Sequence, residues 1–235
     1  MADFRLRIGF AKEGAAVWLS HLEVVRAMER CVRRSGLPYA ISQGFSPHMK
    51  HSFSPALPVG TGSKGEYMDV DLESLVNPKE AIVALKAAEH ENLPVLSVEY
   101  VQRSEPSLQV YYNLATYSLT IEFVQQSKEA AEALTQELMS SLQAKETIEV
   151  VKKGKPKSYD LALYVQSAEY AQTSPSLQDT QGLQESQSPT GILLTVISRP
   201  EGSLRPEVIL NTFAGPEQNL KIASIIRTHL EHKEL

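Results

Sequence analysis

Apolar residues occupy every second position from Phe4 to Phe10, which is the period of a strand with one buried face. A helix is predicted over residues 20–34, because Ser20 and Glu23 have the spacing of a capping box. Within this helix, apolar residues recur every three or four positions, so the helix also has one side to bury. The chain therefore begins with a strand and a helix that can pack together.

The same periodicities predict the elements that follow. They are strands at 66–72, 94–101, 111–124, 148–151, 159–165, 191–197 and 220–228, and helices at 78–90, 127–142 and 206–213. Residues 39–65 have no regular period and contain many glycines and prolines, which predicts a long loop with short strands. Residues 172–189 are rich in Gln, Ser, Thr and Pro, and we expect a disordered insertion there because they have little apolar surface to bury.

The order strand, helix, strand, strand, helix, strand occurs twice along the chain. This order predicts an α+β protein made of two tandem ferredoxin-like (βαββαβ) domains, each with an antiparallel sheet. We place an N-terminal domain with a basic patch and a signature loop at residues 1–105, and a C-terminal domain at residues 106–235. The second repeat is less regular, since the insertion separates its middle strands, and a simpler α+β lid is the alternative.

The composition excludes several classes of protein. The 235 residues are 42% hydrophobic and carry a net charge of −5, so a disordered or fibrous chain is not expected. A single cysteine, Cys31, cannot form an internal disulfide or a metal or iron–sulfur site held by several thiolates, and we interpret it as a buried structural thiol. No apolar run reaches the ~18–20 residues that span a bilayer. We therefore expect a cytoplasmic protein with no membrane segment, no metal and no cofactor.

The net charge hides an uneven distribution. Residues 1–60 hold eight Lys and Arg residues against four Asp and Glu residues, a net charge of +4, and the remainder carries −9. We expect Arg5 and Arg7 of the first strand, the end of the first helix and the following loop to form one basic patch beside aromatic residues, which suits single-stranded RNA. The predicted RNA-binding residues are Arg26, Arg30, Arg33, Arg34, Gln43, Phe45, His48 and Lys50. The alternative is a solvated helix face on which Glu29 pairs with Arg33.

Two histidines, His21 and His48, are the candidates for catalysis. Histidine can act as a general base near neutral pH, and with Lys50 to stabilise negative charge it could cleave RNA through the 2′-hydroxyl without a metal. The alternative is that the loop histidine orders backbone groups or faces water. No metal site is expected, because His48 and His51 lack a third ligand at a suitable spacing. The glycine-rich residues 60–65 do not have the spacing of a phosphate-binding loop and are interpreted as a turn before a strand.

Several of these motifs together resemble a known family. The segments from Arg5 to Gly14 and from Trp18 to Leu72 are similar to the N-terminal block of the uncharacterised radical-SAM-linked (radical-SAM-associated) protein family, a domain of unknown function. The matching motifs are Ser20-His21-Leu22, the helix from Arg26 to Arg34, the loop from Gln43 to His48, Gly65-Glu66-Tyr67, the stretch from Leu204 to Leu210, and Arg227-Thr228. Around Asp160 the chain departs from the family pattern, because the expected arginine is missing there.

The resemblance implies association with a radical SAM enzyme but supplies no activity. The chain cannot itself be that enzyme, since the cluster is normally held by three closely spaced cysteines. The tandem ferredoxin-like interpretation also resembles, at the level of fold, the RAMP-type RNA-processing endoribonucleases.

Three hypotheses follow. The preferred one is a non-catalytic RNA-binding or substrate-presenting module that acts with a radical SAM enzyme in RNA modification or ribosome-related metabolism. The alternatives are a metal-independent endoribonuclease of RAMP type and a protein-interaction scaffold for the radical SAM partner. Both RNA hypotheses expect His21, Arg30, Phe45, His48 and Lys50 to converge on one concave surface, and both lose that physical basis if these residues scatter.

Overall fold

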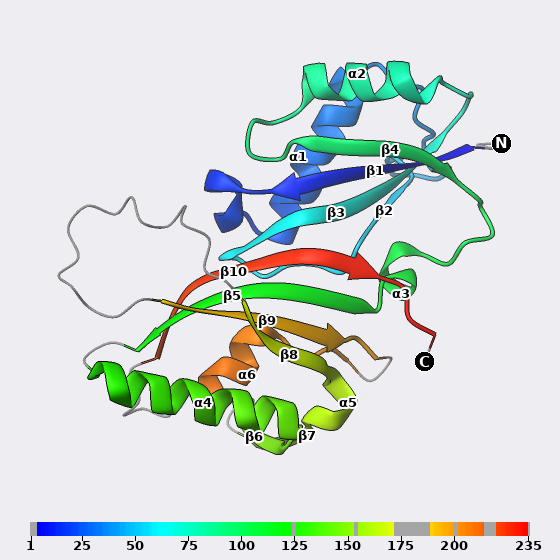
Figure 1. Ribbon diagram of the computed structural model, residues 1–235. Helices are drawn as coiled ribbons and strands as arrows, with labels where there is room; N and C mark the ends of the chain where they lie inside the picture. The colour runs from blue at the N-terminus through cyan, green and yellow to red at the C-terminus, as the bar shows by residue number, and fades with distance from the viewer. Residues whose placement is uncertain are drawn as a thin grey trace. The chain divides into compact units, whose positions relative to one another are not determined.

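The computed structural model describes residues 4–123, 126–152, 155–171, 189–199, 202–213 and 220–234 (Figure 1). The chain forms two compact units, Met1–Asn113 with Arg227–Leu235, and Leu114–Ile226. The last strand of the chain therefore contributes its end to the first unit. The insertion predicted at 172–189 falls almost entirely outside the described residues.

The first unit contains a sheet and two longer helices. Its elements are β1 (Phe4–Lys12), a 3₁₀ turn (Gly14–Trp18), α1 (His21–Arg34), β2 (His51–Phe53), β3 (Thr61–Leu72), α2 (Pro78–Ala88), β4 (Val95–Val101) and the short α3 (Leu108–Tyr111). The strand order is β4-β1-β3, β2 also pairs with β3, and these three pairings are antiparallel. The end of β10 (Leu220–Glu231) lies next to β3. The strand–helix–strand–strand–helix–strand order predicted for this part of the chain is confirmed.

The two faces of this sheet differ in chemistry because side chains alternate along β1. Leu6, Ile8 and Phe10 are at most 1% exposed and pack in one apolar cluster with Met28 and Val32 of α1. The residues between them, Arg5 and Arg7, point to the opposite face. The alternation predicted from the sequence is therefore the one that builds the core.

Cys31 lies in this core and is 1% exposed. Its thiol donates to Leu85 O at 3.5 Å, and burial raises the pKa of the thiol to about 11. A thiol with a raised pKa carries little thiolate at neutral pH. The interpretation of Cys31 as a structural residue is confirmed.

The second unit is also a sheet with helices. Its elements are β5 (Leu114–Phe123), α4 (Lys128–Ala144), β6 (Thr147–Lys152), β7 (Lys155–Asp160), α5 (Leu161–Tyr164), β8 (Val165–Ala171), β9 (Thr190–Ile197), α6 (Pro206–Phe213) and the first part of β10. The strand order is β10-β5-β9-β8, while β6 and β7 form a separate two-stranded sheet. The chain is thus an α+β protein, as predicted.

Three local predictions were wrong. The strand predicted at 111–124 begins only at Leu114, because Leu108–Tyr111 form α3. Residues 159–165 are not one strand: β7 ends at Asp160, whose side chain accepts from Ala162 N and caps α5, and the next strand runs from Val165 to Ala171. Residues 60–65 are not a turn as a whole. Gly60, with φ of +88°, makes the turn, and β3 begins at the next residue.

Among the described residues, no helix is both long and apolar enough to cross a membrane.

Candidate nucleic-acid interface

The helix α1 begins where the sequence predicts it. The backbone N–H and the hydroxyl of Ser20 donate to Glu23 Oε2 at 2.8 and 2.7 Å, and together with the bond that the Ser20 side chain accepts they form a capping box. One side of α1 is buried through Val24, Ala27, Met28, Cys31 and Val32. The other side is consequently free to carry charge.

That other side presents four exposed arginines, Arg26, Arg30, Arg33 and Arg34. Arg33 Nη2 pairs with Glu29 Oε2 at 3.5 Å, and Arg34 Nη2 donates to Ala88 O. In the part of the chain that the structure describes, no carboxylate lies within 4 Å of the guanidinium of Arg26 or Arg30. Side chains four residues apart are neighbours on a helix, so these two arginines form a short basic stripe.

The loop after α1 is closed by local contacts. An isolated bridge joins Ile41 to Met49, which is 1% exposed and anchors the loop in the core. His48 Nδ1 lies 2.9 Å from Ser42 Oγ and 3.1 Å from Ser46 O. This histidine therefore orders the loop, as the alternative interpretation expects.

The tip of the loop projects away from the core. Gln43 and Phe45 are exposed, and the Phe45 ring is completely accessible to solvent. A fully exposed phenyl ring is unusual, since burying such a ring stabilises a protein by ~1.5–3 kcal/mol. The ring is therefore free to stack on a base or to enter a partner protein.

His48 and Lys50 line one open pocket of about 480 Å³. The pocket is also lined by Arg5, Met49, His51, Ser52, Asp69, Asp71, Glu105 and Ser107. It thus contains cationic and anionic groups in comparable number. Two of the predicted site residues are brought together here, beside the outward face of the sheet.

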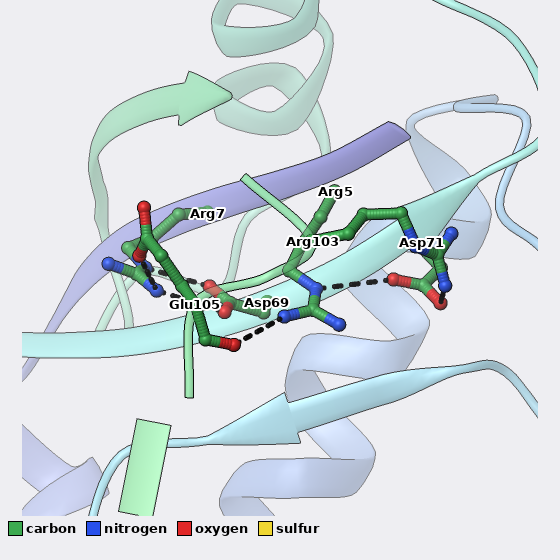
Figure 2. A network of polar contacts seen from close by, with 6 residues as sticks. All are labelled: Arg5, Arg7, Asp69, Asp71, Arg103 and Glu105. Carbon is green, nitrogen blue, oxygen red and sulfur yellow. Dashed lines mark hydrogen bonds and ion pairs between the residues drawn. The ribbon is translucent and has the colours of Figure 1, made fainter. Parts of the chain in front are cut away.

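The arginines of the sheet are neutralised by carboxylates, so the predicted basic patch does not include them (Figure 2). Arg7 is 4% exposed and makes two hydrogen bonds to Asp69, Nε to Oδ1 at 2.9 Å and Nη2 to Oδ2 at 3.1 Å. Its Nη2 also lies 3.3 Å from Glu105 Oε2. Arg5 Nε lies 3.5 Å from Asp71 Oδ1. The expectation of one continuous patch was wrong, because the strand register places a carboxylate opposite each arginine of β1.

Aromatic rings complete the surroundings of Arg7. Its guanidinium lies 5.3 Å from the ring centre of Tyr111 and 5.7 Å from that of Tyr112. Burial lowers the pKa of Arg7, but the bonds to Asp69 outweigh this effect and the pKa is raised overall. Arg7 is therefore a permanently charged structural residue.

His21 lies in a different pocket from His48. It borders a narrow space that Lys12 and Glu66 also line, and its ring meets Phe53 edge-on at 5.8 Å. Burial lowers the pKa of His21. The expectation that five residues converge on one concave surface was wrong: His21 and His48 line different pockets, and Arg30 and Phe45 line neither of them.

Two apolar residues that were not among the predicted site residues, Trp18 and Leu22, are 72% and 65% exposed. Leu22 lies one turn before Arg26 on the helix. The Trp18 ring lies close to Gly60, since a Cβ atom added to Gly60 would be 3.6 Å from it. The signal was available, since Trp18 is the only tryptophan of the chain and directly precedes the arginine-rich helix. Within the described ranges, no three His, Cys, Asp or Glu side chains are grouped so that they could hold a metal ion.

Residues 5–206 match the model of a family described as "Uncharacterized protein conserved in bacteria (DUF2344)". No curated protein matches the chain in sequence. In fold, the chain is similar to a solved structure described as "Crystal Structure of a Cbf5-Nop10-Gar1 Complex", with a TM-score of 0.50 and 11% identity over 99% of this chain and 51% of the other.

A second similar structure is the "Crystal structure of the archaeal box H/ACA sRNP Nop10-Cbf5 complex", with a TM-score of 0.48 and 10% identity over 97% of this chain and 49% of the other. The chain spans about half the length of these proteins. At this level of identity the likeness concerns the fold alone.

Proposed function

Since the chain belongs to the uncharacterised bacterial family DUF2344, whose description names no activity, we propose from its residues that it is a non-catalytic RNA-binding module. The concave surface expected for RNA binding is not formed by the five residues, so in this proposal the first unit binds RNA instead through the exposed side of α1 and the loop that follows it. The module presents the RNA to a radical SAM enzyme in RNA modification or ribosome-related metabolism. The RNA-binding part rests on the structure of α1, and the partner rests on the family resemblance of the sequence motifs.

The observation that carries the proposal is the basic stripe of Arg26 and Arg30 with its neighbours Arg33 and Arg34. Exposed arginines without carboxylate partners add little to stability, yet they attract and bind phosphates. Neighbouring turns of a helix are 5.4 Å apart, so adjacent guanidiniums can contact successive phosphates of a flexible strand. Nucleic-acid binding through phosphates is also independent of sequence, which suits a presenting module.

The exposed aromatic rings supply the second component that single strands need. Bases stack on aromatic side chains with a gain of ~1–3 kcal/mol per base, whatever the base. Phe45 is fully exposed at the tip of the loop, and Trp18 is exposed just before α1. Both rings belong to the same unit as the arginines.

The strand orders support a ferredoxin-like interpretation of both units. In the first unit the strand order is β4-β1-β3-β2. In the second unit, with the separate pair β6–β7 set aside, it is β10-β5-β9-β8. Numbering the strands of each unit along the chain gives the order 4-1-3-2 in both. The pairings described are antiparallel in both. We extend this to the RAMP-type architecture as an analogy of fold only.

RNA binding is tested by titrating a fluorescently labelled single-stranded RNA with the purified full chain and following anisotropy at several salt concentrations. We expect Arg26→Glu with Arg30→Glu to weaken binding roughly tenfold to hundredfold at low salt, because two phosphate contacts become repulsive. The magnitude of the slope of log K against log salt should fall by about 1.4.

The matched control is Lys79→Glu with Lys86→Glu, which makes the same charge change on exposed positions of α2. It should leave binding within about twofold. Equal weakening by both pairs would mean that only net charge matters, and no binding of the unmodified chain at low salt would remove the proposal.

A protein-interaction scaffold is the second candidate, favoured by the exposed apolar side chains Ile41 and Phe45 on one loop. A pull-down of the radical SAM partner with and without nuclease separates the two. A complex that survives nuclease and is lost on Phe45→Ser supports the scaffold, whereas a complex that dissociates is bridged by RNA.

The endoribonuclease alternative gains no support from the geometry. His21 and His48 line different pockets, so they do not form an acid–base pair. The same RNA, incubated with the chain in EDTA, reports this activity directly. Cleavage that disappears in His21→Ala or His48→Ala would restore the alternative.

A further inference from the structure

Lys12, the last residue of β1, is a buried lysine without a partner. It is 2% exposed, and in the described part of the chain no carboxylate lies within 4 Å of its ammonium group and no acceptor lies within hydrogen-bond distance. Lysine is almost never fully buried unless it is paired. Its position therefore requires an explanation.

Glu66, a buried carboxylate that lines the same pocket and attracts Lys12, is already occupied by other partners. Arg227 donates to Glu66 Oε1 through Nε at 2.9 Å and to Glu66 Oε2 through Nη2. Ser54 Oγ also donates to Glu66 Oε2, at 3.0 Å. Both oxygens of Glu66 are thus satisfied without Lys12.

Charge in this region is consequently unbalanced. Lys12 and Arg227 are 2% and 1% exposed, and Glu66 is 6% exposed, so two buried cations share one buried anion. The Lys12 Nζ atom is not among the fully buried polar atoms that lack a hydrogen bond, so the ammonium can be reached from solvent. Burial lowers the pKa of Lys12, and Arg227 lowers it further while Glu66 raises it.

Lys12 also lines a narrow pocket. The pocket has room for about 10 Å³, which is about one water-sized group. Its wall also includes His21, Ser54, the Arg227-paired carboxylate Glu66, and the apolar residues Phe10, Val24, Phe53 and Leu57. Burial keeps His21 neutral at pH 7 by lowering its pKa, so its ring can donate an N–H without adding charge. A small anionic oxygen is the group that fits both the space and the missing charge.

We propose that this pocket binds a phosphate group, placing one anionic oxygen against the Lys12 ammonium with His21 beside it. The phosphate is either free or the terminal group of a larger ligand, and its remaining oxygens stay at the mouth of the pocket. This site is separate from the arginines of α1 and does not depend on the RNA-binding proposal.

The first test measures the thermal unfolding of the full chain in inorganic phosphate and in chloride at equal ionic strength and pH. Phosphate should raise Tm by roughly 3–5 °C for each tenfold increase above its Kd, because it binds only the folded chain. Lys12→Met should abolish this rise. Lys64→Met, an exposed lysine of β3, should keep it.

A second measurement does not depend on how stable the variant is. In the unmodified chain labelled with ¹³C-lysine, the Cε signal of Lys12 reports its protonation, and Lys12→Met assigns that signal. Phosphate should raise the pKa of Lys12, since an adjacent anion favours the charged form. An unchanged Lys12 pKa, or an equal Tm rise with and without Lys12, would overturn the proposal.

Two RNA oligonucleotides of one sequence, with a 5′-phosphate or a 5′-hydroxyl, identify the source. Tighter binding of the 5′-phosphorylated RNA that disappears in Lys12→Met assigns the pocket to an RNA end. Equal binding of both RNAs, with a phosphate effect retained, assigns it to a free or small-molecule phosphate. The variant Arg26→Glu with Arg30→Glu should weaken RNA binding but keep the response to inorganic phosphate.

Discussion

The arginines of β1 and those of α1 belong to one basic segment of the sequence, yet they have opposite environments. Arg7 is 4% exposed and forms two hydrogen bonds to Asp69. Arg26 and Arg30 are exposed, and none of the described carboxylates lies within 4 Å of them. The same residue type thus serves the fold in one place and remains available in the other.

The difference arises from the register of the sheet. Pairing β1 with β3 places Arg5 opposite Asp71 and Arg7 opposite Asp69. Opposite charges at facing positions stabilise an antiparallel pair. On α1, by contrast, Glu29 is the acidic residue that pairs with an arginine of the exposed side, and it also contacts His51. The net charge of +4 over residues 1–60 therefore overstates the positive charge available on the sheet, because its arginines are paired with carboxylates. It reflects mainly the exposed arginines of α1.

The largest expected effect on stability comes from replacing Arg7, the buried arginine of β1. Arg7→Met should lower the free energy of unfolding by about 3–5 kcal/mol, because it leaves Asp69 as a buried carboxylate without its partner. Urea unfolding of the full chain, followed by circular dichroism, measures the change. Arg26→Met, the same substitution on α1, should change it by no more than about 0.5 kcal/mol.

A double variant shows whether the loss of stability comes from the unpaired Asp69 carboxylate or from the packing around Arg7. Arg7→Met with Asp69→Leu should recover most of the lost stability, because a buried ion pair replaced by apolar side chains is often neutral. If Arg7→Met alone costs less than about 1 kcal/mol, the proposed distinction between structural and available arginines does not hold.

The first unit could largely be predicted because its signals are local. The alternation of β1 and the capping box at Ser20 and Glu23 are visible within a few residues, and both are observed. The contact between Arg7 and Asp69 joins residues 62 positions apart, and it depends on where Gly60 turns the chain into β3. A sequence shows that both charges exist, but only the register shows that they cancel.

The candidate site was harder to predict for the same reason. The exposure of α1 follows from its periodicity, so its four arginines were identified correctly as a surface group. The separation of His21 from His48 depends on packing around Phe53 and Glu66, which no spacing reveals. In the second unit, the cap at Asp160 divides a stretch of residues that periodicity alone assigns to one strand.

A smaller effect on stability is expected from the protonation of His21. Burial lowers the pKa of His21 below its value in the unfolded chain, so the unfolded state binds more protons near pH 6. The stability associated with neutral His21 is present above pH about 6.5 and is lost as pH falls through its lowered pKa. Urea unfolding between pH 7.5 and 5.5 should show this decrease.

His21→Gln keeps a polar side chain without a titrating group, and it should flatten the decrease in stability between pH 7.5 and 5.5. His48→Gln, the same substitution at an exposed histidine, is the matched control. An identical decrease in the unmodified chain and in His21→Gln would show that another group is responsible.

The smallest effect concerns the ion pair between Arg33 and Glu29 on the exposed side of α1. Arg33 and Glu29 are four residues apart and 3.5 Å from each other, and the Arg33 side chain is 48% exposed. Such pairs contribute about 0.3–0.5 kcal/mol, and salt screens them. A double-mutant cycle of Arg33→Gln and Glu29→Gln should therefore give a coupling energy within that range at low salt and near zero at 1 M salt. A coupling above about 1 kcal/mol would make Arg33 a structural residue like Arg7, whereas the expected value leaves stability unable to explain why this side of α1 is so rich in arginine.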